Sequence, residues 1–346
     1  MSDLRTILNP KNSDGPLRVV SIGGGTGLST LLHGLKQYVR GRGVRNWPLD
    51  IAAIVTVTDD GGSSGRLRRE FDVLPPGDIR NCLVALSEDE GLLSRLFQYR
   101  FDAGRGLKGH SFGNLFLTAL TRITGDFPDA VRESSEVLAI KGHIYPATGD
   151  NVALEAILEN GKRVLGETKI SKSPRRIVSL HLRPRRCRPL PDALAAIAHA
   201  DVITLGPGSL FTSVIPNLLV GGIAKAIQRS HAVKALFVNL MWQPGETTNF
   251  TASDHIEAIH RHARCKLLDY AVVNTRKIQP ALLRRYARQE SAPVKNDFKE
   301  IAALGVKVVC GDYVQESGLV RHNSDAIAAI AIELAMEGRK RRKMSR

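Results

Sequence analysis

Continuous apolar runs alternate with amphipathic segments along most of the chain. Residues 17–22 form a first apolar run, and residues 28–39 follow it with helical periodicity. A second run over 50–57 (D-I-A-A-I-V-T-V) is apolar at nearly every position, which is typical of a parallel strand that helices cover on both faces. The pattern therefore predicts an α/β fold with a mostly parallel sheet flanked by helices. Further strands are expected over 177–182, 201–205, 235–240, 270–274 and 306–310, and a closing helix over 324–336.

The middle of the chain has a different pattern. Residues 75–140 are expected to be mostly helical, with helices over 79–86 and 112–121. Two apolar-rich runs then flank Asn160-Gly161, a dipeptide that favours a β-hairpin turn. We therefore predict one domain over 17–337 with a small hairpin insertion. Its halves, about 17–145 and 200–337, are joined by the hairpin region and lie between a flexible extension, 1–16, and a basic tail, 338–346.

A glycine-rich loop follows the first predicted strand. Four of the five residues 23–27 are glycines, and a helical pattern begins directly behind them. Glycines let backbone N–H groups approach a ligand closely, and a helix N-terminus favours an anion. The loop predicts a phosphorylated small molecule or nucleotide at Gly24, Gly25, Thr26 and Gly27. A tight turn without a ligand is the alternative. Leu28 replaces the third glycine of the dinucleotide fingerprint, so NAD is allowed rather than indicated.

Two other strand ends carry similar loops. Asp59 and Asp60 end the second strand, and Gly61, Gly62 and Ser63 behind them form a second backbone cradle. The two carboxylates suit a ribose hydroxyl, or Mg²⁺ with Asp59 as a ligand, or the capping of nearby N–H groups. A third strand ends in a comparable loop, with Gly206, Gly208 and Ser209 as its candidate contacts. Because parallel strands end at one edge of a sheet, these loops are expected to meet.

Polar groups also gather at two predicted helix starts. Asp78, Arg80 and Asn81 open one helix, where Arg80 is placed to reach a phosphate; an Asp cap beside a surface Arg is the alternative. Ser111 lies in a G-x-S-x-G pattern, but no strand precedes it as a nucleophile elbow requires. We therefore expect Ser111 and Asn114 to face a ligand from a helix start.

Three further candidates lie near these elements. His110 is either a proton donor or an ordinary loop histidine. Asn239 lies at the end of the apolar run 235–240 and Glu246 follows that run; polar residues there predict substrate contacts or an ordinary polar turn.

Composition narrows the class of protein. The formal net charge is +15, with six arginines over 175–188 and six basic residues at the C-terminal end. Only 5% of residues are aromatic, so a nucleic acid is not the expected partner. Four scattered cysteines, no secretory signal and no apolar run of about 18 residues predict a cytoplasmic chain without a membrane span.

Taken in order, these blocks resemble the YvcK family of gluconeogenesis factors, which is related to the CofD-type 2-phospho-L-lactate transferases. The resemblance covers about residues 17–335. The matching stretches are Gly23–Leu28, Val57–Arg66, Pro75–Asn81, Gly109–Asn114, Gly206–Leu210, Gln243–Thr247 and Val320–His322.

The resemblance implies a Rossmann-like fold and a cytoplasmic protein that binds UDP-sugars and serves growth on gluconeogenic carbon and cell shape. It adds Tyr286 and Arg321 as candidate nucleotide-sugar contacts. The CofD branch instead implies a Mg²⁺-dependent transfer of a phospho-lactyl group from a nucleotide carrier. A nucleotide-sugar sensor and a transferase thus both remain open. The protein partners to consider are cell-wall synthesis or regulatory proteins, and a homo-oligomer is expected.

Overall fold

Seven parallel strands form the central sheet of the computed structural model, which describes residues 15–39, 49–88 and 91–344. In order across the sheet these are β10 (Lys307–Gly311), β9 (Tyr270–Asn274), β8 (Val233–Phe237), β7 (Val202–Leu205), β1 (Leu17–Gly23), β2 (Leu49–Val55) and β3 (His143–Pro146). In β1, Val20 lies opposite Ile203 of β7 on one side and Ala52 of β2 on the other. The chain therefore builds the sheet outward from β1 in both directions, and the predicted α/β class is confirmed.

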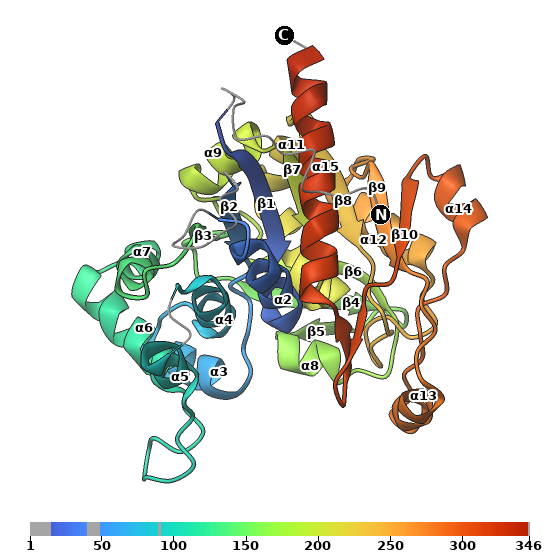
Figure 1. Ribbon diagram of the computed structural model, residues 1–346. Coiled ribbons are helices and arrows are strands. Elements are labelled where there is room, and N and C mark those ends of the chain that lie inside the picture. The colour runs from blue at the N-terminus through green and yellow to red at the C-terminus, as the bar shows by residue number, and fades with distance from the viewer. Residues whose placement is uncertain (1–14, 40–48, 89–90, 345–346) are drawn as a thin grey trace.

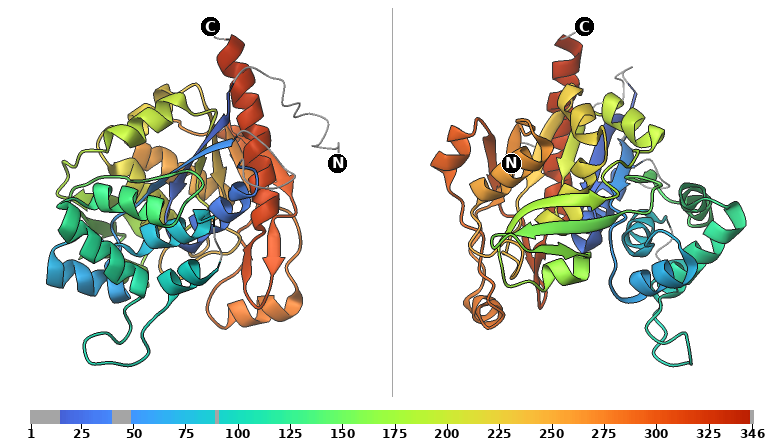
Figure 2. Two further views of the ribbon diagram at one scale, coloured as in Figure 1. Left: turned by 60° about the vertical axis from the view of Figure 1, so that its left-hand side comes forward. Right: turned by 180° about the vertical axis from the view of Figure 1, so that it is seen from behind.

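Helices cover both faces of this sheet (Figure 1). The helices α2 (Gly25–Lys36) and α15 (Ser324–Met344) pack against each other, and both pack on β1. On the opposite face lie α9 (Pro191–His199), α10 (Ile215–Leu219) and α11 (Ile223–Arg229), as the rear view in Figure 2 shows. Because both faces are covered, Val19, Ile22, Ile51 and Ile54 are fully buried. This burial explains the continuous apolar runs in the sequence.

A helical lobe stands beside the β3 edge of the sheet (Figure 1). It contains α3 (Gly62–Phe71), α4 (Gly77–Leu86), α5 (Leu92–Gln98), α6 (Phe112–Thr124) and α7 (Phe127–Val137). The β10 side carries α12 (Ala252–Ala263), α13 (Pro280–Ala287) and α14 (Phe298–Ala303). The segment 75–140 is therefore mostly helical, as predicted.

Two small antiparallel sheets complete the fold. Across one of them the strand order is β5 (Arg163–Leu165), β4 (Ala153–Leu158) and β6 (Ile177–Arg183). The helix α8 (Glu167–Ser171) lies between β5 and β6 in the sequence. The β4–β5 pair is the hairpin that the Asn160-Gly161 turn predicts. The other sheet pairs β11 (Val314–Glu316) with β12 (Val320–His322).

The structure corrects several expected boundaries. The backbone cradle expected at Gly61, Gly62 and Ser63 is in part a helix start, because α3 begins at Gly62 and places Leu67 in the core. The strand β3 was not predicted. The helix α12 begins with a capping box at Thr251: the Thr251 side chain accepts from the Asp254 N–H, and the Asp254 carboxylate accepts from the Thr251 N–H.

The basic residues at 339–343 belong to a helix rather than to a separate tail. The helix α15 continues past the expected end at residue 336, and Arg339 and Arg342 form ion pairs with the fully buried Asp201 at 2.6 and 3.0 Å. Of the expected extension 1–16, only residues 15 and 16 are described, and both accept hydrogen bonds from Arg339.

No single helix among the described residues is long and apolar enough to cross a membrane. A π-helical turn over Leu210–Val214 continues into α10. This segment and α11 would together be long and apolar enough, but the two are bent by 81° relative to each other.

Candidate functional site

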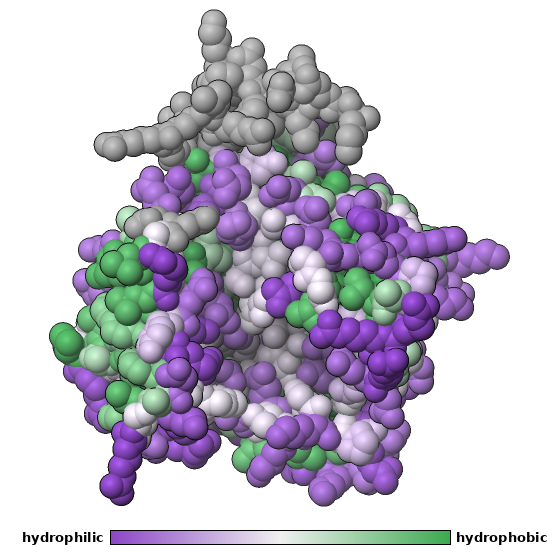
Figure 3. Space-filling model, turned by 60° about the horizontal axis from the view of Figure 1, so that its bottom comes forward, coloured by the Kyte–Doolittle hydropathy of each residue, from purple (hydrophilic) through white to green (hydrophobic). Residues whose placement is uncertain are grey.

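A cleft with a volume of about 380 Å³ opens at the carboxyl ends of β1 and β7. In Figure 3 the face that carries the carboxyl ends of the strands is hollowed near its centre and rimmed by hydrophilic residues. The strand order reverses direction between β1 and β7, because β2 lies on one side of β1 and β7 on the other. Open α/β sheets bind ligands at such a switch point, outside the carboxyl ends of the strands. Its lining residues are Gly24, Gly25, Thr26, Gly27, Thr30, Pro207, Gly208, Ser209, Ser213, Asn239, Leu240, Met241, Gln243, Tyr286, Val320, Arg321 and His322.

One wall of the cleft consists of two loops in direct contact. A Cβ atom on Gly27 would lie 2.5 Å from the Pro207 carbonyl oxygen, and one on Gly208 would lie 3.3 Å from the Gly24 carbonyl oxygen. Both positions need glycine because backbone fills the space that a side chain would take. The loops thus present backbone N–H groups at the start of α2, whose N-cap residue Gly24 supplies no side-chain acceptor.

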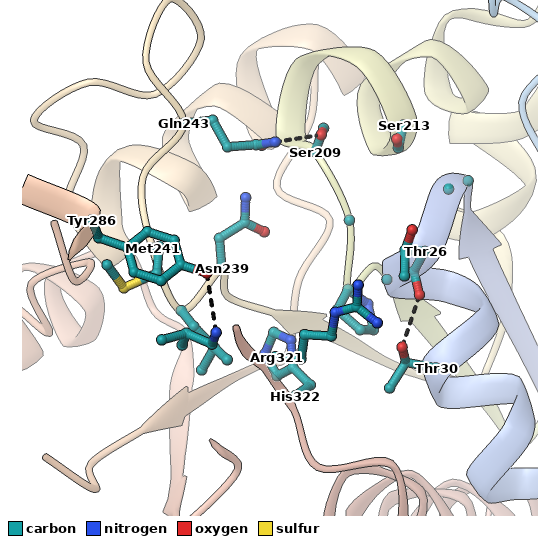
Figure 4. Close-up of a pocket in the computed structure, with 17 residues that line it drawn as sticks. Thr26, Thr30, Ser209, Ser213, Asn239, Met241, Gln243, Tyr286, Arg321 and His322 are labelled. Carbon is teal, nitrogen blue, oxygen red and sulfur yellow. Dashed lines mark hydrogen bonds between the residues drawn. The ribbon is translucent and has the colours of Figure 1, made fainter. Parts of the chain in front are cut away.

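The opposite wall brings polar side chains from distant parts of the chain (Figure 4). The Tyr286 hydroxyl on α13 accepts a hydrogen bond from the Val320 N–H at 3.0 Å, which places α13 beside β12. The strand β12 carries Arg321 into the cleft, between Asn239 and Thr26 in this view. Gln243 Nε2 donates to Ser209 Oγ at 2.8 Å and links the two walls. A cation and several neutral hydrogen-bonding groups therefore face the glycine loops.

His322 adds a neutral group to the cleft. Desolvation of its ring lowers its pKa to about 4, although a hydrogen bond with the Val238 backbone favours the charged form. The positive charge at neutral pH on the wall formed by β12 therefore comes from Arg321.

Beside the glycine loop lies a cluster of carboxylates. Asp78 is half-buried at the start of α4 and accepts a hydrogen bond from the Gly25 N–H; desolvation, and next the charge of Asp59, raise its pKa to about 7. Asp59 Oδ1 accepts from the Gly61 N–H at 2.8 Å. A Cβ atom on Gly77 would lie 3.0 Å from Asp59 Oδ2, so α4 starts against this carboxylate.

Glu167 on α8 belongs to the same cluster. Burial raises its pKa to about 9, with further contributions from the charges of Asp59, Asp78, Glu246 and Asp60. This residue was missed in the sequence, because the neighbouring acids come from other elements and no local pattern marks it. Among the described residues, no three His, Cys, Asp or Glu side chains are arranged as a metal site.

The other predicted polar residues lie at the starts of α3 and α6. Ser63 Oγ and His110 Nδ1 are 2.9 Å apart, and burial, with the nearby Arg66 charge, lowers the His110 pKa. Ser111 is fully buried as the N-cap of α6 and accepts from the Asn114 N–H at 3.3 Å. The histidine and both serines are thus held by neighbouring protein groups and do not line the cleft.

Arg80 and Asn114 contain buried polar atoms without a partner. Arg80 Nη2 donates to Asn81 Oδ1 at 2.7 Å, but Arg80 Nε and Asn114 Oδ1 have no hydrogen-bond partner among the described residues. Arg80 packs against Gly113, where a Cβ atom would lie 2.9 Å from its Cδ. Arg80, Asn81 and Asn114 therefore lie between α4 and α6 rather than in the cleft.

Asp60 and Glu246 hold neighbouring elements in place and do not line the cleft. Asp60 Oδ1 accepts from the N–H and the hydroxyl of Thr168 at 2.8 and 2.6 Å, which fixes α8. Glu246 Oε1 accepts from Ser171 Oγ at 2.9 Å and from Thr212 Oγ1 at 3.3 Å, and burial raises its pKa.

Glycines 61, 62 and 206 likewise shape the surrounding loops without lining the cleft. Gly62 and Gly206 have positive φ angles of 46° and 74°, a backbone conformation that favours glycine.

The structure brings nine predicted residues together around the cleft. They are Gly24, Gly25, Thr26, Gly27, Gly208, Ser209, Asn239, Tyr286 and Arg321. Thr30 and Ser213 also line the cleft, although neither was predicted as a site residue. Each follows a predicted residue by four positions, Thr26 and Ser209, and helical spacing places such pairs on one face.

Comparisons with known proteins match most of this chain. A family model described as 2-phospho-L-lactate transferase CofD matches residues 19–314. A relative from Nostoc sp. is 51% identical over 321 residues, which are 91% of this chain and 68% of the relative. A Halalkalibacterium halodurans relative named "Gluconeogenesis factor" is 46% identical over 316 residues, 91% of this chain and 95% of its own. The crystal structure of Bacillus halodurans protein BH3568 is similar with a TM-score of 0.87 and 46% identity, covering 92% of this chain and 99% of that chain.

Proposed function

The chain belongs to the CofD family and resembles the gluconeogenesis factors within it, and from that membership we propose that it is a cytoplasmic regulator that binds a UDP-sugar. The observation that carries the proposal is the contact between the two glycine loops at the cleft, through Gly27 and Pro207. Two adjacent loops of backbone N–H groups suit the two linked phosphates of a nucleotide sugar. Arg321 opposite them supplies a compensating cation.

The remaining lining residues suit the sugar and the nucleoside. Asn239, Gln243, Ser209 and Thr26 offer both donors and acceptors, which sugar hydroxyls require. Thermal unfolding of the protein against a panel of nucleotides and nucleotide sugars, with and without Mg²⁺, tests the proposal. A UDP-sugar, with UDP-N-acetylglucosamine as the first candidate, should raise the melting temperature in a concentration-dependent way. If no nucleotide sugar in the panel raised the melting temperature, the proposal would be refuted.

The carboxylate cluster favours a second candidate, a transferase that uses a nucleotide-linked donor. Mg²⁺ prefers oxygen ligands and binds through one or two carboxylates plus substrate phosphates. Asp78 and Asp59 fit that requirement, since Asp78 lies against Gly24 of the glycine loop and the charge of Asp59 raises the pKa of Asp78. These two residues would hold the ion, which would neutralise phosphate charge. Mg²⁺-dependent release of a nucleotide from the bound donor would support this candidate, and ligand binding that is independent of Mg²⁺ without any turnover would oppose it.

A further inference from the structure

A second cavity, of about 400 Å³, continues the cleft towards α13. We call it the α13 pocket. It lies at the carboxyl ends of β8 and β9, and Asn239 and Leu240 line both it and the cleft. Its walls are largely apolar and include Val238, Ile278, Leu283 and Val294.

The polar groups of the α13 pocket are mostly committed to the protein. Asn274 Nδ2 donates to the Arg276 carbonyl at 2.8 Å, and Asn274 Oδ1 accepts from the Tyr313 N–H at 3.1 Å. Asn296 Nδ2 donates to the Asn274 carbonyl at 2.7 Å, so its Oδ1 is the amide atom left to accept a hydrogen bond. The pocket therefore combines apolar walls with an acceptor, as a flat heterocycle with a ring N–H requires.

Charge separates the roles of the two cavities. In the α13 pocket, Arg276 is already paired with Asp312 at 3.3 Å and with Glu316 at 3.5 Å, and the other lining cation, Lys277, is exposed. In the cleft, Arg321 has no ion-pair partner among the described residues, and it faces the glycine loops. A phosphate is therefore better stabilised in the cleft, while an uncharged group is better placed in the α13 pocket.

From this arrangement we infer that the α13 pocket binds the nucleobase of the nucleotide sugar. The inference rests on the proposed function. The diphosphate then lies on the glycine loops, the ribose passes Asn239 and Leu240, and the base packs among Leu240, Ile278 and Leu283. Asn296 Oδ1 accepts from the ring N–H of uracil. The opposite arrangement, with the base on Tyr286 and the sugar in the α13 pocket, would bury sugar hydroxyls against apolar side chains.

The substitution Leu283→Trp tests the inference by filling the α13 pocket. No residue of α13 is fully buried, so the larger side chain is tolerated by the fold. Leu282→Trp is the matched control on the same helix, because Leu282 lines neither cavity. Leu283→Phe is a smaller change that keeps the test available if the Trp variant unfolds. Calorimetry would follow the binding of UDP and of UDP-N-acetylglucosamine to the full chain.

Leu283→Trp should weaken both ligands at least tenfold, by the same factor, because both carry the base. Leu283→Phe should have a smaller effect on both ligands, and Leu282→Trp should bind them like wild type. Weakening of UDP-N-acetylglucosamine alone would put the sugar in the α13 pocket and overturn the inference, as would unchanged binding of both ligands. If the wild-type chain bound neither ligand, the proposed function itself would fall, and the inference with it.

Discussion

Gly27 touches Pro207: a Cβ atom on Gly27 would lie 2.5 Å from the Pro207 carbonyl oxygen and 2.7 Å from the Gly208 nitrogen. The glycine loop after β1 therefore serves two purposes. It exposes backbone N–H groups at the start of α2, and it lets the loop after β7 approach until both loops form one wall of the cleft. The atoms of the second loop that lie nearest to Gly27 belong to the backbone, and they cannot move aside as the end of a flexible side chain would.

Gly27→Ala should separate the two loops. Overpacking of this kind costs about 1–3 kcal/mol of unfolding free energy, and binding of UDP-N-acetylglucosamine should weaken at least tenfold. Gly149→Ala is the control, since its added Cβ atom would meet the nearest atom at an ordinary 3.7 Å. Chemical denaturation and calorimetry measure the two effects. Wild-type affinity in Gly27→Ala would show that the contact between the loops does not shape the ligand site.

The carboxylate cluster should make stability fall as pH rises. Asp78 has a native pKa of about 7, so from about pH 4 to pH 7 the folded protein holds a proton that the unfolded chain has lost. For Glu167, with a native pKa of about 9, the window extends to about pH 9. The free energy of unfolding therefore decreases through these windows. Asp78→Asn should remove the pH dependence that Asp78 causes, and the variant should be more stable than wild type by about 1–4 kcal/mol near pH 8.

Denaturation curves between about pH 4 and pH 9 would measure this difference. Asp102→Asn, which removes an exposed carboxylate, is the control and should follow the wild-type curve. Parallel curves for Asp78→Asn and wild type over the whole range would mean that Asp78 is not protonated in the native state.

The C-terminal half of α15 should contribute strongly to stability. Asp201 has no exposed surface, and it pairs with Arg339 and Arg342 and accepts from the Arg18 N–H at 2.9 Å. Asp201→Ala removes the buried carboxylate that the half-buried Arg339 and Arg342 share, and should cost about 3–5 kcal/mol of unfolding free energy. Asp129→Ala removes the exposed ion pair with Arg132 and should cost at most about 1 kcal/mol. Equal losses in the two variants would contradict a structural role for the Asp201 contacts.

Ser111 should act as a helix cap and not as a nucleophile. It is fully buried and its hydroxyl accepts from the Asn114 N–H. A fluorophosphonate probe should therefore leave it unlabelled in the native protein, as judged by mass spectrometry. Ser111→Ala should lower the unfolding free energy by about 1 kcal/mol, the usual loss for a cap. Stoichiometric labelling of Ser111 would reinstate a serine hydrolase.

The elements that could be predicted from the sequence are those whose burial leaves a pattern within the element itself. The strand β9 has the predicted bounds Tyr270–Asn274, because its burial leaves a continuous apolar run. The strand β3 (H-I-Y-P) was missed because His143 is exposed and Pro146 ends the strand. The helix α3 was missed because glycines and serines at its start are typical of turns, while the contact that stabilises it, burial of Leu67, is tertiary.

The same distinction applies to the site. The glycines at 24–27 have a local signal, since a loop of this kind between a strand and a helix has few other uses. Glu167 has none, because its high pKa arises from burial beside acids that three other segments supply. His322 and Gln243 likewise become lining residues only when β12 and the loop after β8 reach the cleft.

One experiment separates a regulator from an enzyme: incubation of the full chain with UDP-N-acetylglucosamine and Mg²⁺, with calorimetry for binding and chromatography for the fate of the ligand. We predict saturable binding, weakened by Arg321→Ala, and quantitative recovery of the intact nucleotide sugar after many dissociation half-lives. Consumption of the nucleotide sugar that depends on the protein and is lost in Asp78→Asn would contradict the sensor and establish a transferase.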